Sequence, residues 1–476
     1  MEFKMKVLFA SSEAYPFAMS GGLADVAGAL PKALRTRLIG CRVVMPLYEC
    51  VPEEMRHEMK FLGSVSVPVS WRRQYCGVFE AKVGNVIYYL LDNQYYFKRG
   101  GLYGHYDDAE RFAFFSRAVL EILPLVDFKP DIIHCNDWQT ALVPVYLDAF
   151  YRNHHDLYSN IKTVFTIHNI QYQGKYGREL ISDVFGLPDE MSHIIEYDDC
   201  VNLLKGAVEC SNAVTTVSPT YSREILDPWY AFGLDGILRE RSWKIHGILN
   251  GIDTEVYNPE TDKMIDHHYS ADDLSGKRKD KQKLREILGL EQNDDVPVVG
   301  IVSRLVSHKG FDLVKHEFEA MLGMGVQFAV LGSGEWEFET FFHSMAEKYP
   351  GRVGLRLGFD QNLAHKIYAG SDIFLMPSKS EPCGLSQLVA LRYGSIPVVR
   401  RTGGLADTIK DSGLGDGNGF TFDNYNANDM AHAVYRAVEG FKDRKGWEIL
   451  VKRAMRCDNS WGVSANEYIK LYKSIL

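Results

Sequence analysis

The stretch VVGIVSRL, from Val298 to Leu305, begins with five apolar residues and ends next to a cation. Such an uninterrupted apolar run is typical of a strand that is buried on both faces, and strands of this kind belong to parallel sheets. Seven similar runs recur along the chain, separated by longer stretches of mixed polarity. This alternation predicts an α/β fold with doubly wound parallel sheets. The other predicted strands are Lys6–Ala10, Ile132–Cys135, Val164–Ile167, Ala213–Val217, Gln327–Leu331, Ile373–Met376 and Ile396–Val399, with helices at Leu23–Leu34 and Ser386–Tyr393.

A polar segment divides the chain into two such series. Between Asn258 and Asp295 the composition turns polar and charged, and the strand at Val298 then begins a second series. A chain of 476 residues is too long for one ordinary core. We therefore expect two domains with a boundary near residues 252–258, after the turn dipeptide Asn250-Gly251. A surface insertion within one domain is the alternative, which the length disfavours.

The composition excludes several classes of protein. The 53 basic and 62 acidic residues give a net charge of -9, which argues against non-specific nucleic-acid binding. No apolar run reaches the ~18 residues that a membrane span needs. The run Val7–Ala10 is too short for the core of a signal peptide. The eight cysteines form no Cys-x-x-Cys pair, so we expect free thiols in a cytoplasmic protein without membrane partners.

Several common catalytic motifs are missing from the sequence. It contains no Gly-x-Gly-x-x-Gly, no P-loop, no His-Glu-x-x-His and no Gly-x-Ser-x-Gly. It also contains no Asp-x-Asp, so a metal held between aspartates and a diphosphate is not indicated. Adjacent aspartates lie in polar stretches, where we expect solvated surface. These pairs are 107–108, 198–199, 272–273 and 294–295.

Glycine-rich turns follow four of the predicted strands or open predicted helices. Glycine lets a ligand approach the backbone, and free N–H groups at a helix start attract phosphate oxygens. One such turn is explained by packing alone, but four favour a nucleotide or a phosphorylated ligand at the carboxyl ends of the strands. The turns are Ser20-Gly21-Gly22, Gly332-Ser333-Gly334, Pro382-Cys383-Gly384-Leu385-Ser386 and Thr402-Gly403-Gly404. The pentapeptide Gly-Gly-Leu-Ala-Asp occurs twice, at 21–25 and at 403–407.

Five charged or polar residues near strand ends are candidates for chemistry. Arg304 and Lys309 have the charges to clamp a diphosphate, although, taken alone, the two cations are better explained as loop surface charges. Glu381 is able to bind a ligand hydroxyl or to stabilise a developing positive charge, or it interacts with a helix dipole. His168 and Asp137 each follow a predicted strand. A structural role for the histidine, and a helix cap for the aspartate, are the alternatives.

Taken in order, these segments resemble the bacterial glycogen and starch synthases, the ADP-glucose-using glucan synthases of glycosyltransferase family five. Each segment alone is short, but their order and spacing through most of the chain are specific. The matching segments are Gly21–Val26, Asn136–Trp138, Phe165–Asn169, Tyr172–Gly174, Val214–Ser218, Asn250–Asp253, Ser303–Leu305, Lys309–Gly310, Pro377–Ser378, Glu381–Leu385, Thr402–Asp407, Ser460–Trp461 and Tyr468.

The resemblance implies the GT-B fold, in which two Rossmann-like domains face each other across a cleft. It assigns residues 1–252, with a returning carboxy-terminal segment 460–476, to the glucan acceptor and residues 253–459 to the nucleotide-sugar donor. The implied reaction moves glucose from ADP-glucose to the non-reducing end of an α-1,4-glucan, retains the anomeric configuration, and uses no metal or other cofactor. The residues by themselves leave ADP-glucose and UDP-glucose open as donors.

The resemblance also implies a role for each candidate residue. Arg304 and Lys309 would neutralise the departing diphosphate, and Glu381 would stabilise positive charge on the sugar. His168 would hold a sugar hydroxyl, while Asp137 and Asn250 would orient the glucose. An aromatic side chain at Phe359, where relatives often carry tyrosine, would stack on adenine. The remaining substrate-binding positions are Gly21, Gly22, Asp25, Cys383, Gly384, Leu385 and Ser386, with the N–H groups of Gly22, Leu385 and Ser386 contacting phosphate.

One position departs from the family pattern. The first family motif begins with lysine, and this chain has Met19 there. A second hypothesis is therefore a catalytically weak relative that binds glucan or nucleotide and acts as a scaffold or regulator. A third, a nicotinamide-dependent oxidoreductase, is disfavoured by the missing dinucleotide fingerprint.

Overall fold

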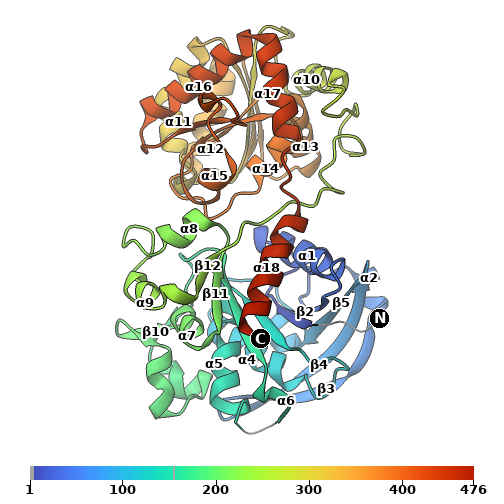
Figure 1. Cartoon of the computed structure of the whole chain (residues 1–476), viewed down its shortest axis with the longest axis vertical. Helices are drawn as coiled ribbons and strands as arrows, with labels where there is room; N and C mark the ends of the chain where they lie inside the picture. The colour runs from blue at the N-terminus through green and yellow to red at the C-terminus, as the bar shows by residue number, and fades with distance from the viewer. Residues whose placement is uncertain (1–4, 154–155) are drawn as a thin grey trace. The chain divides into compact units, whose positions relative to one another are not determined.

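Two sheets of mainly parallel strands, each flanked by helices, organise the chain in the computed structural model, which describes residues 5–153 and 156–476 (Figure 1). The chain divides into two units. Unit 1 comprises Met1–Asn250 and Trp461–Leu476, and unit 2 comprises Gly251–Ser460. The boundaries expected from the sequence, after residue 252 and before residue 460, lie within two residues of these divisions.

Unit 1 contains a nine-stranded sheet in the order β12-β11-β7-β6-β1-β2-β5-β4-β3. The strands from β12 to β5 run parallel, whereas β4 and β3 add an antiparallel edge. A small sheet, β8-β10-β9, lies apart from it. The bounds are β1 Lys6–Ala10, β2 Gly40–Pro46, β3 Lys60–Val69, β4 Arg72–Val83, β5 Val86–Asp92, β6 Ile132–Asn136, β7 Lys162–Ile167, β8 Lys175–Tyr176, β9 Glu196–Tyr197, β10 Cys200–Asn202, β11 Ala213–Thr216 and β12 Ile245–Gly247.

The chain's last helix belongs to unit 1. Helix α18 (Trp461–Ile475) packs beside α1 (Gly22–Arg35). Tyr472 of α18 is buried, and its hydroxyl lies 2.7 Å from Nδ1 of His134 on β6. The other helices of unit 1 are α2 Glu53–His57, α3 Gln94–Phe97, α4 Asp108–Glu121, α5 Leu142–Tyr146, α6 Asp156–Ser159, α7 Leu203–Cys210, α8 Pro219–Glu224 and α9 Asp235–Glu240.

Unit 2 is built on six parallel strands in the order β15-β14-β13-β16-β17-β18. This is the 3-2-1-4-5-6 order of doubly wound nucleotide-binding domains. The strand order reverses between β13 and β16. The bounds are β13 Val298–Val302, β14 Gln327–Gly332, β15 Val353–Leu357, β16 Ile373–Met376, β17 Ile396–Arg400 and β18 Phe420–Phe422.

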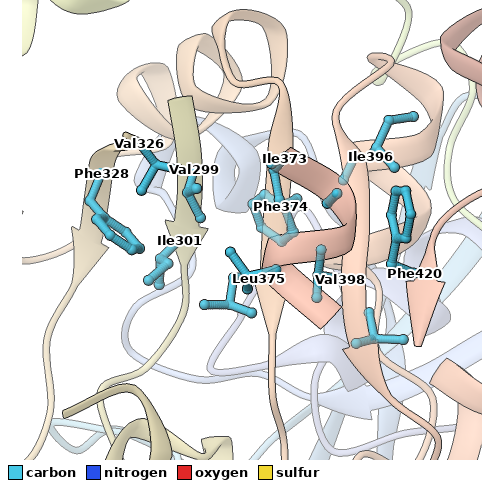
Figure 2. Close-up of a cluster of buried hydrophobic side chains, with 14 of the residues drawn as sticks. Val299, Ile301, Val326, Phe328, Ile373, Phe374, Leu375, Ile396, Val398 and Phe420 are labelled. Atoms are coloured by element: carbon cyan, nitrogen blue, oxygen red, sulfur yellow. The ribbon is translucent and has the colours of Figure 1, made fainter. Parts of the chain in front are cut away.

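The core of unit 2 forms along this sheet. Figure 2 shows Val299 and Ile301 of β13 in the same buried cluster as Phe328 of β14 and Phe374 of β16. Burying each such side chain stabilises the fold by ~1.5–3 kcal/mol, which explains why the strands are almost continuously apolar. The helices of unit 2 are α10 Ser275–Leu288, α11 Phe311–Gly323, α12 Trp336–Lys348, α13 Gln361–Gly370, α14 Ser386–Arg392, α15 Gly403–Thr408, α16 Ala427–Lys442 and α17 Arg444–Met455.

The polar segment 258–295 contains a helix whose charges point inward. Lys277, Lys281 and Arg285, four residues apart on α10, are buried. The Lys277 ammonium donates to the carbonyl oxygens of Ala369 and Ser371 at the end of α13, at 2.8 and 3.0 Å. The Nζ atom of Lys281 lies 2.7 Å from Oδ2 of the buried Asp372. The segment is therefore part of the packing of unit 2 and not a surface insertion.

One adjacent aspartate pair also contradicts the expectation of solvated surface. Asp108 is buried, and its Oδ1 lies 2.5 Å from Nη1 of the buried Arg111. Its neighbour Asp107 pairs with Arg99 at 2.6 Å. The two aspartates thus start helix α4 inside an ion-pair network. The pairs at 198–199, 272–273 and 294–295 are exposed, as expected.

The eight cysteines are free in the structure. None of the helices in the described part of the chain has the length and apolar character that crossing a bilayer requires.

Candidate active site

The charged candidate residues of unit 2 lie in the loops that follow β13 and β16, the two strands between which the strand order reverses. Arg304 follows β13, and Glu381 follows β16. Ligands of open α/β sheets bind beyond the carboxyl ends of the strands at such a reversal point. Arg304 is exposed there, whereas Glu381 is buried.

Lys309 and Glu381 form an ion pair between these loops. The Lys309 ammonium donates to Oε2 of Glu381 at 2.7 Å, and the Ser378 hydroxyl donates to the same oxygen at 2.9 Å. Gly310, at φ +82°, allows this approach, because a Cβ on it would lie 2.1 Å from the carbonyl oxygen of Pro377. Lys309 is therefore not a free loop charge but part of a built carboxylate–ammonium site.

The glycines after β17 pack directly against the segment that contains Glu381. A Cβ on Gly403 would lie 1.9 Å from the Glu381 carbonyl oxygen, and one on Gly404 would lie 2.1 Å from that of Cys383. The Gly404 N–H donates to the carbonyl oxygens of Glu381 and Pro382 at 3.1 Å. These two glycines, interpreted from sequence as ligand-facing, are required for packing.

The turn before α14 brings the remaining unit 2 candidates to the same sheet edge. Cys383 is buried, Gly384 has φ +72°, and the chain enters α14 through Leu385 and Ser386. The Gln387 amide donates to the carbonyl oxygens of Cys383 and Gly384 at 3.0 Å each and holds the turn. The first N–H groups of a helix have no partner one turn earlier, so those of α14 are able to bind an anion.

Phe359 follows β15 at the same edge and is strongly exposed. The chain turns at Gly358, whose φ is +113°. Asp360 then caps α13 by accepting a hydrogen bond from the N–H of Leu363 at 2.9 Å. The exposed ring is thus held between a glycine turn and a capped helix, where a flat ligand is able to stack on it.

In unit 1, Asp137 and His168 follow the neighbouring strands β6 and β7, and they contact each other. The Asp137 carboxylate accepts a hydrogen bond from the His168 N–H at 2.8 Å. Asp137 makes no side-chain cap to the helical turn that follows it, so the capping interpretation is wrong. Its φ of +56° is unusual for an aspartate, and such strain clusters at functional sites.

Asn136 orients the imidazole of His168. Its Oδ1 lies 2.9 Å from Nε2 of His168, and its Nδ2 donates to the Ala10 carbonyl oxygen at 2.9 Å. Nε2 therefore carries a proton, which leaves Nδ1 as an acceptor for a ligand hydroxyl. Burial lowers the pKa of His168 to about 3, so the ring is neutral at neutral pH. No role was predicted for Asn136, because its amide acts through these two partners, which only the fold brings together.

Glu13 is a second residue that sequence reasoning missed. It lies just past β1, is buried, and accepts a hydrogen bond from the Ser20 N–H at 2.5 Å. Burial raises the pKa of Glu13 to about 7. Burial also raises the pKa of Asp137 to about 7, with a smaller contribution from the charge of Glu13. Its position after a predicted strand was the available signal.

The other unit 1 candidates lie around the start of α1 and the end of the sheet. Gly21 caps α1, Gly22 is its first residue, and Asp25 is exposed in its first turn. A Cβ on Gly21 would meet nothing within 4 Å, so packing does not require this glycine. Met19 is half exposed in the same loop. Asn250 follows β12, and its buried Oδ1 has no hydrogen-bond partner in the part of the chain that the structure describes.

The sequence comparisons identify the family. A family model described as the starch synthase catalytic domain matches residues 6–240, and one described as glycosyl transferases group 1 matches residues 280–449. A glycogen synthase of Geobacillus thermodenitrificans is 51% identical over 476 residues, covering 99% of this chain and 98% of the relative. One of Bacillus cereus is 50% identical, covering 99% and 100%.

The chain belongs to the glycogen and starch synthase family.

The solved structures agree with this family. The catalytic domain of Starch Synthase IV from Arabidopsis thaliana, bound to ADP and acarbose, has a TM-score of 0.91 and 36% identity and covers 99% of both chains. A sucrose-phosphate synthase of Thermosynechococcus elongatus, at 17% identity and a TM-score of 0.60 with 99% coverage of both chains, shares the fold. The GT-B fold is confirmed, and the protein is a glycosyltransferase that elongates an α-glucan.

The family assignment replaces the oxidoreductase hypothesis, and the weak-relative hypothesis gains no support from these matches.

Within residues 5–153 and 156–476, no group of three or more His, Cys, Asp or Glu side chains is arranged to hold a metal ion.

Proposed function

We propose that this glycogen and starch synthase family member transfers glucose from ADP-glucose to the non-reducing end of an α-1,4-glucan and retains the anomeric configuration. The observation that carries the proposal is the Lys309–Glu381 pair at the reversal point of unit 2, which supplies both charges that glycosyl transfer from a diphosphate requires. The curated relatives are named glycogen synthases, and the Arabidopsis starch synthase structure contains ADP.

Unit 2 would bind the donor. The exposed Arg304 guanidinium and the Lys309 ammonium would bind the diphosphate, with fork geometry and a point charge respectively. Phe359 would stack on the adenine ring. When the donor arrives, its phosphate oxygens would share the ammonium that Glu381 holds in the free protein. No metal is needed in this proposal, because the two cations neutralise the leaving group.

The transfer would proceed on one face of the sugar. The bond from glucose C1 to the phosphate oxygen breaks while the acceptor O4 bonds to C1, and the acceptor proton passes to the departing phosphate oxygen. Glu381 would stabilise the positive charge that develops on the sugar, and the cations would stabilise the departing diphosphate. Such preorganised electrostatic stabilisation is commonly the largest single contribution to catalysis.

Unit 1 would bind the glucan. The neutral His168 would accept a sugar hydroxyl at Nδ1, since Asn136 occupies Nε2. Asp137 would also bind a sugar hydroxyl, as would the buried Oδ1 of Asn250. Glu13, a carboxyl with its pKa raised to about 7, lies past the next strand end. Hydroxyl-binding groups that already have fixed orientations lose little freedom when the substrate binds.

A transfer assay with labelled nucleotide sugars tests the proposal. We expect label from ADP-glucose to enter glycogen with all α-1,4 linkages, and label from UDP-glucose to enter more slowly. Lys309→Met should abolish most transfer, whereas Lys315→Met, which removes an exposed lysine paired with Glu337 at 2.8 Å, should not. No incorporation from ADP-glucose into glycogen or malto-oligosaccharides would refute the proposal.

A further inference from the structure

The loop at residues 225–234 connects α8 to α9 in unit 1 (Figure 1). It exposes two large aromatic side chains. Trp229 is 73% exposed and Phe232 is 52% exposed. The loop is ordered by its own hydrogen bonds, since the Asp227 carboxylate accepts from the Trp229 N–H at 2.8 Å. Large apolar rings usually gain stability by burial, so an ordered loop that exposes two of them needs an explanation.

A buried glutamine fixes this loop to the segment after β7. The Gln173 amide nitrogen donates to the carbonyl oxygens of Ala231 at 3.4 Å and Phe232 at 3.2 Å. Its Oε1 accepts from the Asn202 side chain at 2.7 Å. Tyr172, which precedes Gln173, is itself exposed. The three exposed rings of Tyr172, Trp229 and Phe232 therefore stand on two segments that one buried side chain holds together.

The backbone at Phe232 is strained. Its φ of +49° lies in the left-handed region, which a bulky aromatic residue rarely adopts. The next residue, Gly233, has φ +90°, and its carbonyl oxygen accepts a hydrogen bond from the Tyr197 hydroxyl at 3.0 Å. The surrounding hydrogen bonds thus hold the backbone of Phe232 in an unfavourable conformation. Strain of this kind persists mainly where a surface has a function.

The same segment begins at the proposed reaction site. His168 is the first residue after β7, and Tyr172 follows it by one turn, with its N–H donating to the Asn169 carbonyl oxygen at 3.2 Å. The Tyr221 hydroxyl of α8 accepts from the N–H of Ile170 in this segment at 3.2 Å. The aromatic residues are thus connected to His168 through short, hydrogen-bonded chain segments within unit 1.

We infer that Tyr172, Trp229 and Phe232 form a binding platform for an α-glucan chain whose reacting end lies near His168. The inference rests on the proposed function, which makes a glucan the acceptor. A glucose ring has an apolar C–H face that stacks on an aromatic ring, while its hydroxyls point outward to water and polar groups. Glu224 and Asp227, near the rings in sequence, disfavour an anionic membrane surface as the occupant.

The other exposed tryptophans of unit 1 provide contrast. The Trp71 indole N–H donates to the Asp183 carboxylate at 3.0 Å, which docks the β3–β4 turn. Trp243 is 74% exposed, but it lies directly before β12 and therefore at the amino ends of the parallel strands. His168 lies past the carboxyl end of β7. Trp243→Ala is therefore a matched control, because it removes an equally exposed indole from the wrong end of the strands.

Native gel electrophoresis in gels that contain glycogen tests the platform. We expect the dissociation constant for glycogen to rise at least fivefold in Trp229→Ala and in Phe232→Ala, and the ratio of KM for glycogen to KM for a short malto-oligosaccharide to rise with it. Phe232→Gly should lose glycogen affinity while its melting temperature is maintained or rises, because glycine accepts the left-handed φ. Trp243→Ala should behave as the wild type.

Two outcomes would overturn the inference. Glycogen retardation equal to wild type in Trp229→Ala and Phe232→Gly would mean that the rings do not bind glucan. An equal loss in Trp243→Ala would mean that exposed indoles bind glycogen without a built platform. Failure of the proposed function looks different, since the wild type would then transfer no glucose to either acceptor while glycogen retardation could still be measured.

Discussion

The Lys309–Glu381 pair permits a quantitative prediction that does not depend on substrate. In Lys309→Met the ammonium is removed and the apolar stem is kept. In the described part of the chain, the buried Glu381 carboxylate then retains one hydrogen-bond donor, the Ser378 hydroxyl at 2.9 Å. Two unit charges 2.7 Å apart attract by about 6 kcal/mol at an effective dielectric constant of ~20. Desolvation of the carboxylate offsets part of that attraction, and removing one partner of a buried pair costs ~3–5 kcal/mol.

The side chain of Lys309 is 19% exposed, so water moderates the loss. We expect Lys309→Met to lower the free energy of unfolding by about 3 kcal/mol. At ~2–4 °C per kcal/mol for a domain of this size, unit 2 should melt about 6–12 °C lower. Glu381→Gln should lower the free energy of unfolding by about 2 kcal/mol, because the partly buried Lys309 ammonium then loses its charged partner. The double variant should lose ~2 kcal/mol less than the sum of the two single losses, and this difference is the coupling free energy of the pair.

Urea unfolding of the four proteins without nucleotide measures this coupling. The exposed pair Lys315–Glu337, at 2.8 Å, is the matched control, and its coupling should not exceed ~0.5 kcal/mol. Losses at Lys309 and Glu381 that add within ~0.5 kcal/mol would refute the claim that the pair stabilises unit 2. Calorimetry with ADP provides a second check, since Lys309→Met should weaken ADP binding at least ~10-fold by removing a charge-assisted contact worth ~1.5–3 kcal/mol.

Four further predictions concern catalysis and pH. Glu381→Ala and His168→Ala should each lower kcat by ~30- to 1000-fold while ADP affinity changes much less, and near-normal turnover in either would contradict its role. The pKa values of Glu13 and Asp137 are raised to about 7, so the folded ligand-free protein binds more protons than the unfolded chain between pH 5 and 7. Its free energy of unfolding should therefore fall as the pH rises through that range, and Asp137→Asn should reduce the slope; an unchanged slope would argue against the raised pKa. Excess EDTA should leave glucose transfer intact, and a loss that magnesium or manganese restores would exclude the metal-independent proposal. Met19→Lys should raise kcat/KM for ADP-glucose by about tenfold or more if a missing cation limits donor binding, whereas an unchanged or lower value would assign the role to another cation.

The sequence predicted the central parallel strands of both units for a physical reason, but it did not predict the parallel strands β2, β5 and β15. Strands such as β1, β13 and β16 are buried on both faces, so their apolar runs are continuous and end where the strands end. The β3–β4 pair was missed because one face is exposed and the apolar residues alternate. A three-residue strand such as β12 contains too few residues to show any period.

Helix α10 shows where composition misleads. Its sequence is among the most charged in the chain, and such composition is typical of a solvated surface. Lys277 is nevertheless buried because its ammonium satisfies the carbonyl oxygens at the end of α13, and Lys281 is buried because Asp372 neutralises it. The local sequence does not distinguish these buried lysines from exposed ones, because the groups that they pair with lie about 90 residues away along the chain.

The candidate site was predictable to the extent that it follows from strand ends. His168, Asp137 and Glu381 all lie just past parallel strands, where side chains from different strands converge. Glu13 follows β1 in the same way but stands in no recognisable motif. The role of Asn136 was not predictable from the sequence. It depends on two hydrogen bonds, to His168 and to the Ala10 carbonyl oxygen, which form only in the folded chain.

The two copies of Gly-Gly-Leu-Ala-Asp show that one pentapeptide has two physical roles. In the second copy, Gly403 and Gly404 lie against the backbone of Glu381–Cys383, and a Cβ on either would clash with a carbonyl oxygen. In the first copy, a Cβ on Gly21 would enter open space, and its φ of -165° is one that any residue adopts. Glycine at position 21 is therefore not explained by packing or by backbone conformation. Under the proposed function, a substrate that approaches the start of α1 would give a physical reason for glycine at position 21, whereas the second copy is explained by its packing against the backbone of Glu381–Cys383.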